Sequence, residues 1–107
     1  MDSEKQHAII GKVLSDKREA EKKQAMLKKE AERLGNVLEN LAGYLRGNVE
    51  YVWFCGASTN EHYPHPRGDV FSVSDVDGQR IAELTSEIRN TMDEIKRLNG
   101  EARALGF

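Results

Sequence analysis

The sequence predicts a mainly α-helical fold: an antiparallel coiled-coil helical hairpin, with a small β-hairpin and loop insert between its two helices, that assembles into an oligomeric bundle. Three observations predict it. Apolar residues recur at alternating steps of three and four toward both ends of the chain, which is the spacing of a coiled-coil seam. A β-prone, turn-rich segment separates the two series. Only 38% of the 107 residues are apolar and 32% are charged, so a thick globular core is not expected.

The first helix is predicted over residues 4–46. From Ile10, the alternating steps reach a series that is apolar except at Lys17 and Gln24: Val13, Lys17, Ala20, Gln24, Leu27, Ala31, Leu34, Leu38, Leu41 and Leu45. Polar groups at such seam positions lower stability but fix the register and the oligomeric state. The helix is predicted to end at Gly47 and Asn48, where glycine can take the left-handed cap conformation.

The second helix is predicted over residues 77–105. Its series has the same spacing, with one polar member: Ile81, Leu84, Ile88, Thr91, Ile95, Leu98, Ala102 and Leu105. Asp77 is the predicted N-cap, because its carboxylate can accept a hydrogen bond from the first free N–H groups of the helix. The helix is predicted to end near Gly106. The whole chain is thus a single domain.

The insert is predicted over residues 48–76. Apolar and aromatic residues alternate from Val49 to Cys55, and a second β-prone run contains Val70, Phe71 and Val73. Residues 56–69 have the composition of a loop. We therefore expect a two-stranded β-hairpin with a long loop, which must pack on the helix ends or on a second copy because an isolated hairpin is marginally stable.

The two predicted helices differ in length. At 1.5 Å per residue they span about 64 Å and about 42 Å. If the insert turns the chain straight back, Ile81 lies near Leu45, Leu105 lies near residue 20, and residues 4 to about 18 have no intramolecular partner. This overhang carries four apolar side chains that would be exposed, and we expect them to form the contact of a homodimer or higher oligomer: Ile9, Ile10, Val13 and Leu14.

Aromatic residues gather in the insert beside histidine and arginine. The candidate contact residues are Trp53, Phe54, Tyr63, His65 and Arg67. Three interpretations stay open: the aromatic side chains cap the end of the bundle, they form a contact with a protein, or they bind a small anionic or nucleotide-like ligand.

A metal site and a catalytic site are the remaining interpretations of the insert. Cys55, His62 and His65 could hold zinc, with Asp69 as a fourth ligand, but the close first pair of a structural zinc site is missing. A cysteine nucleophile with a histidine base lacks an assignable orienting residue. We therefore predict no catalytic residue, no cofactor and no metal, and keep a zinc-binding loop module as a second alternative.

These patterns predict a non-catalytic, oligomeric coiled-coil interaction protein, an adaptor, scaffold or inhibitor, whose partners are a further copy of itself and another protein. A net charge of −2 argues against duplex nucleic acid, since phosphate binding needs a concentrated basic face. No apolar run reaches the roughly 18 residues needed to cross a bilayer. A single cysteine, Cys55, agrees with a reducing, cytoplasmic location.

Overall fold

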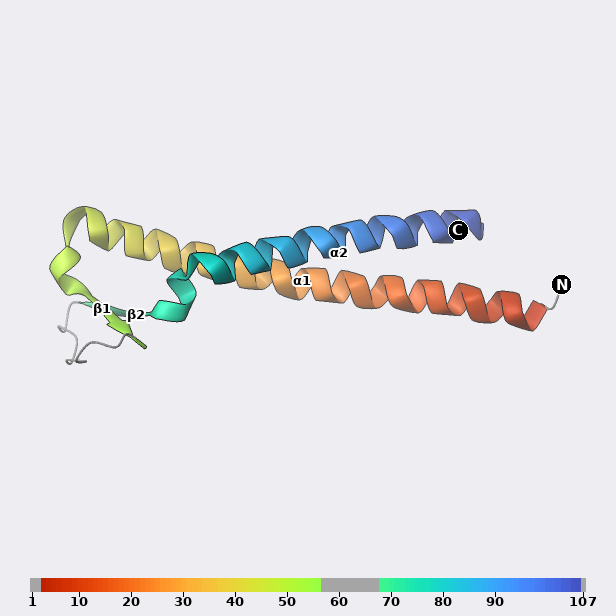
Figure 1. Ribbon diagram of the computed structural model, residues 1–107, viewed down its shortest axis with the longest axis horizontal. Coiled ribbons are helices and arrows are strands. Elements are labelled where there is room, and N and C mark those ends of the chain that lie inside the picture. The colour runs from red at the N-terminus through yellow and green to blue at the C-terminus, as the bar shows by residue number, and fades with distance from the viewer. Residues whose placement is uncertain (1–2, 57–67, 107) are drawn as a thin grey trace. The chain divides into compact units, whose positions relative to one another are not determined.

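The protein is mainly helical, with two long helices and a short two-stranded sheet between them in the chain (Figure 1). The computed structural model describes residues 3–56 and 68–106. Its elements, in chain order, are helix α1 (Ser3–Gly47), the 3₁₀ helix η1 (Val49–Tyr51), strand β1 (Val52–Cys55), strand β2 (Asp69–Ser72), the 3₁₀ helix η2 (Val73–Val76) and helix α2 (Gly78–Ala104). The predicted helical class and both predicted helices are confirmed.

The chain divides into two compact units. The first, which we call the helical unit, comprises Met1–Lys29 and Thr85–Phe107; the second, which we call the mixed unit, is Glu30–Leu84. The helical unit contains the first part of α1 and most of α2. The mixed unit contains the rest of α1, the sheet, both 3₁₀ helices and the start of α2.

In both helices, the residues of the predicted apolar series lie on the face that the protein covers. Every member of either series is buried or half-buried except Leu45, which is exposed. In the helical unit the most deeply buried side chains are Val13, Ala20, Thr91, Leu98 and Ala102. The 3-4 spacing therefore identified which face of each helix the protein buries.

The core of the mixed unit joins α1 to the sheet. Leu34 and Leu41 of α1 are buried, as is Phe71 of β2. The Phe71 ring meets Tyr44 of α1 edge to face, with centroids 6.2 Å apart, and Phe54 of β1 at 6.1 Å. Aromatic pairs in such geometry stabilise by about 0.5–1.5 kcal/mol beyond the area that they bury, so these rings hold one face of the sheet on α1.

The two strands are parallel, so the predicted β-hairpin is wrong. Val52 pairs with Asp69, and the register continues to Cys55 and Ser72. A hairpin needs a tight turn, whereas parallel strands need a connection of about a dozen residues or more. The connection over residues 56–68 is long enough for this. The first strand is also shorter than expected, because Val49–Tyr51 forms a 3₁₀ helix.

The ends of the helices follow the sequence in part. The predicted N-cap is confirmed, since the Gln79 N–H donates a hydrogen bond of 3.0 Å to Oδ1 of Asp77. Helix α1 ends at Gly47 as expected, but without a left-handed cap: positive φ among the described residues occurs at Gly56 and Gly106. Gly106 follows α2 with a φ of 96°, a conformation that favours glycine.

Helix α2 begins beside Glu30 of α1, not beside Leu45 as the simple return of the chain predicted. Nη2 of Arg80 lies 3.4 Å from Oε1 of Glu30. The insert causes the difference, because it packs on the last turns of α1 through Phe71 and Tyr44. The part of α1 that precedes Glu30, residues 3–29, has as many residues as α2, 27. Ile81 therefore does not lie near Leu45, and the expectation that residues 4 to about 18 have no intramolecular partner depended on that placement.

Candidate functional site

The four predicted contact residues near the start of α1 differ in exposure. Val13 is buried within the helical unit, Ile10 and Leu14 are half-buried, and Ile9 is 51% exposed. The chain itself thus covers most of this apolar group. An oligomer contact there stays a prediction that depends chiefly on Ile9.

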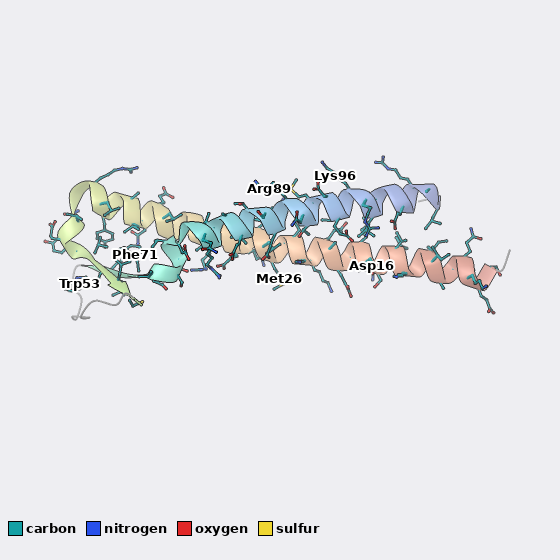
Figure 2. The ribbon with its side chains drawn as sticks, in the orientation of Figure 1. Asp16, Met26, Trp53, Phe71, Arg89 and Lys96 are labelled. Carbon is teal, nitrogen blue, oxygen red and sulfur yellow. The ribbon has the colours of Figure 1, made fainter. Side chains whose placement is uncertain are left out.

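The aromatic candidates of the insert lie on opposite faces of the sheet. Because alternate residues of a strand point to opposite faces, Phe54 shares a face with Phe71, its partner in the register, and Trp53 shares the other face with Val70. Figure 2 shows Trp53 and Phe71 on the two strands. Val70 is half exposed and Trp53 is half-buried. The remaining candidates, Tyr63, His65 and Arg67, lie outside the described residues.

The zinc interpretation gains no support. The thiol of Cys55 is exposed at the end of β1, and His62 and His65 lie outside the described residues. Within residues 3–56 and 68–106, no three histidine, cysteine or acidic side chains are grouped so that they could hold a metal ion.

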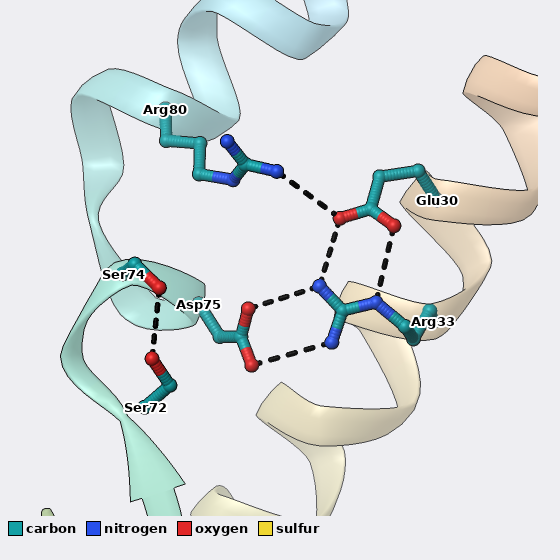
Figure 3. A network of polar contacts seen from close by, with 6 residues as sticks. All are labelled: Glu30, Arg33, Ser72, Ser74, Asp75 and Arg80. Atoms are coloured by element: carbon teal, nitrogen blue, oxygen red, sulfur yellow. Dashed lines mark hydrogen bonds and ion pairs between the residues drawn. The ribbon is translucent and has the colours of Figure 1, made fainter. Parts of the chain in front are cut away.

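A network of charged side chains joins the insert to α1 (Figure 3). The Arg33 guanidinium lies between two carboxylates and donates two hydrogen bonds to each. Its bonds to Asp75 of η2 measure 2.9 and 3.2 Å, and those to Glu30 measure 2.8 and 3.1 Å. Arg80 of α2 contacts Glu30 as well. Exposed ion pairs stabilise little, but a guanidinium bound through two N–H groups fixes orientation.

The network shifts the pKa of its members toward the charged forms. Hydrogen bonds from Arg33 lower the pKa of Glu30 and of Asp75. Hydrogen bonds to Glu30 and then to Asp75 raise the pKa of Arg33. All three groups are therefore charged at neutral pH, and the two acids protonate only at a lower pH than free carboxyl groups.

A second polar cluster surrounds the start of β2. Nδ2 of Asn40 donates a 3.0 Å hydrogen bond to Oδ2 of Asp69. The Tyr44 hydroxyl also bonds to this carboxylate, and the pKa of Tyr44 is raised, first by desolvation and then by the charge of Asp69 and that hydrogen bond. Two side chains of α1 thus position one carboxylate of the sheet.

Two adjoining hollows lie beside this cluster in the mixed unit. One, of about 500 Å³, is lined by Asn36, Glu39, Asn40, Gly43, Tyr44 and Asn48. The other, of about 310 Å³, is lined by Asn36, Val37, Asn40, Asp69, Val70, Phe71, Ser72 and Asp75. Because they share Asn36 and Asn40, we treat them together and call them the α1–β2 groove. Sequence reasoning missed it, although asparagines four residues apart, away from the apolar series, were a visible signal.

A further hollow lies in the helical unit. It measures about 440 Å³ and is lined by Asp16, Glu19, Ala20, Lys23, Asn90, Thr91 and Glu94. Its two buried residues, Ala20 and Thr91, are small, so the helices are less completely packed at this level than at Leu98.

Comparison with protein families, with curated proteins and with solved structures finds no match. Neither described helix contains a stretch long and apolar enough to cross a membrane.

Proposed function

We propose that this chain is a non-catalytic coiled-coil interaction protein that associates with a second copy of itself and binds another protein through its insert. The observation that carries the proposal is the set of large apolar side chains left exposed in the mixed unit: Leu45 at 55%, Val49 at 58%, Val70 at 50% and Val73 at 37%. Four of the seven large apolar side chains exposed among the described residues thus fall between positions 45 and 73, and exposed apolar side chains that lie together are typical of contact surfaces.

An antiparallel arrangement of the helices is part of the proposal. In the mixed unit Asp75 pairs with Arg33, and five residues later Arg80 pairs with Glu30. The partner number on α1 falls as the number on the returning chain rises, as expected for antiparallel segments. A helical hairpin of this kind leaves an open flank that a second copy can cover.

Binding without catalysis explains the residues that the fold leaves exposed. An adaptor, a scaffold and an inhibitor all act by occupying a surface, and each needs exposed apolar side chains on a rigid support. The aromatic packing of Phe71 on α1 provides such a support for the neighbouring Val70. The single cysteine agrees with action in the cytoplasm.

Size-exclusion chromatography with light scattering tests the association of the chain with itself. We expect a dimer at micromolar concentration, and the mass of a single chain would contradict this half of the proposal. Ile9→Asp should lower the mass, because it places a charge in the exposed apolar position. The matched control is Lys5→Asp, an exposed change one turn away. An unchanged mass in Ile9→Asp would remove this end of α1 from the contact.

A photo-crosslinking residue at position 49 tests the binding of another protein. We expect it to form a specific adduct in the native host, and we expect Val70→Asp to abolish that adduct. The same crosslinker at Lys22, on the exposed surface of the helical unit, is the control. Equal labelling from both positions would argue against the insert as the contact surface.

A further inference from the structure

We propose that the α1–β2 groove binds an extended peptide bearing lysine or arginine, which adds as a third strand to the edge of β2 that β1 does not pair with. The inference rests on the proposed function, since the peptide would be a segment of the protein partner. It names a second contact, which shares Val70 with the exposed apolar side chains.

The groove follows an edge of the sheet rather than a face. All four consecutive residues of β2, Asp69–Ser72, line it. Successive side chains of a strand point to opposite faces, so a hollow that touches every residue runs along the main chain. No residue of β1 lines the groove, and β1 pairs with β2 along its other edge. The groove therefore lies at the edge that β1 leaves open.

That edge has main-chain groups to offer. The described residues form a sheet of two strands, each four residues long, and a sheet of this size is marginal by itself. An edge strand presents a row of N–H and C=O groups toward solvent. An added strand pairs with this row, and main-chain hydrogen bonds then give affinity for an extended peptide. At about 3.3 Å per residue, four to six residues match the length of β2.

The opposite wall of the groove is polar. Asn36 and Asn40 lie one turn apart on α1 and line both hollows. Nδ2 of Asn40 is bonded to Asp69, which leaves its carbonyl oxygen as an acceptor. The Asn36 carboxamide, which is exposed, offers both a donor and an acceptor. The wall is open at Gly43, where nothing lies within 4 Å of the position that a Cβ would occupy.

The charge of the groove selects a basic peptide. Its described lining contains Glu39, Asp69 and Asp75 but no lysine, arginine or histidine. Arg33 neutralises Asp75, whereas among the described residues Asp69 receives hydrogen bonds from the uncharged Asn40 and Tyr44. The described lining thus carries a net negative charge, which attracts a cationic side chain and disfavours an anionic one.

The test uses the full chain and a labelled peptide, Thr-Lys-Val-Lys-Val-Lys-Thr, followed by fluorescence anisotropy. We expect saturable binding, and we expect Glu39→Arg to weaken it roughly fivefold, the size of one exposed charge pair. Glu87→Arg makes the same charge change on the exposed surface of α2 and should leave the affinity within about twofold. The peptide with glutamate in place of lysine should bind less well to the natural chain and better to Glu39→Arg.

Two further measurements separate strand addition from simple charge attraction. The basic peptide with alternate N-methylated amides keeps its charge but loses main-chain donors, so it should bind at least tenfold more weakly; equal binding would overturn the inference. Amide NMR signals of β2 should shift on titration, while those of the helical unit stay in place. No binding at millimolar peptide would also overturn it. A specific adduct from position 49 in that case would show that the proposed function survives without the groove.

Discussion

The helical unit and the mixed unit are stabilised in different ways, although α1 runs through both. In the helical unit the buried residues belong to the two regularly spaced series, and several are small: Ala20, Thr91 and Ala102. In the mixed unit one aromatic ring, Phe71, and one arginine, Arg33, connect segments that are distant in the sequence. Arg33 and Asp75 are 42 positions apart. A periodic pattern suffices to specify the first unit, whereas the second depends on individual side chains.

The largest expected effect is the loss of the Phe71 ring. Phe71→Ala removes the buried side chain that contacts both Tyr44 and Phe54, and we expect the free energy of unfolding to fall by about 3–5 kcal/mol. Urea denaturation measures this, and hydrogen exchange should show the loss first in β1 and β2. Val70→Ala, at a half-exposed neighbouring position, should cost less than about 1 kcal/mol. If both variants lost the same free energy of unfolding, Phe71 would not be the residue that holds the sheet on α1.

The corresponding test in the helical unit is Leu98→Ala. Leu98 is 1% exposed, the most buried side chain of the described chain, and truncation should cost about 2–5 kcal/mol. Met92→Ala, at a 41% exposed position, is the control and should cost less than about 1 kcal/mol. We expect exchange to rise in residues 85–104 before it rises in the sheet. A simultaneous rise in both units would show that they unfold together and would weaken the comparison.

A smaller effect, of opposite sign, is expected at Thr91. Its hydroxyl is buried and donates a 2.7 Å hydrogen bond to the main-chain oxygen of Glu87 in its own helix. Thr91→Val keeps the shape of the side chain, and the main-chain oxygen of Glu87 keeps its helical hydrogen bond. Thermal unfolding should therefore show that the free energy of unfolding rises by about 0.5–1 kcal/mol. Thr91→Ser keeps the hydroxyl and removes a methyl group, and should lose about 1 kcal/mol. If Thr91→Val also lost stability, the hydroxyl would have a specific stabilising role.

The smallest effect is the acid dependence of the charged network. The folded-state pKa values of Glu30 and Asp75 are lowered, so their stabilisation is complete above the unfolded pKa values of about 4 and is lost as the pH falls through the lower folded values. The natural chain should therefore lose stability as the pH falls below about 4, where the carboxyl groups of the unfolded chain bind protons before those of the folded chain do. Denaturation of Arg33→Met should show a smaller loss over this range. An identical loss in both chains would mean that other carboxylates cause it.

The helices could be predicted closely because their signals are local. The expected ranges, 4–46 and 77–105, differ by one residue at each end from the observed Ser3–Gly47 and Gly78–Ala104, and the cap at Asp77 was recognised from its position. Burial at Leu34 and Leu98 likewise follows from spacing alone. These features depend on residues that are three or four positions apart.

The arrangement of the mixed unit could not be predicted in the same way. Strand direction depends on the path of a long connection. The identities of Val52 and Asp69 do not indicate whether their strands pair in parallel. Arg33 resembles any exposed arginine of a helix until Asp75 is placed beside it. The groove along β2 was missed for the same reason, because Asn40 and Asp69, 29 positions apart, define it only once the strand lies on α1.

Because α1 contacts Asp75 in η2 and Arg80 at the start of α2, the number of residues in η2 determines where α2 begins. Removing one residue from Val73–Val76 would draw the start of α2 toward Ser72 and turn its apolar stripe by about 100°. Ile81 and Leu84, which are half-buried in the same unit, would then rotate toward water, even though no residue of either helix had been altered. A 3₁₀ helix of 4 residues thus sets which face the first two turns of α2 turn toward α1 in the mixed unit.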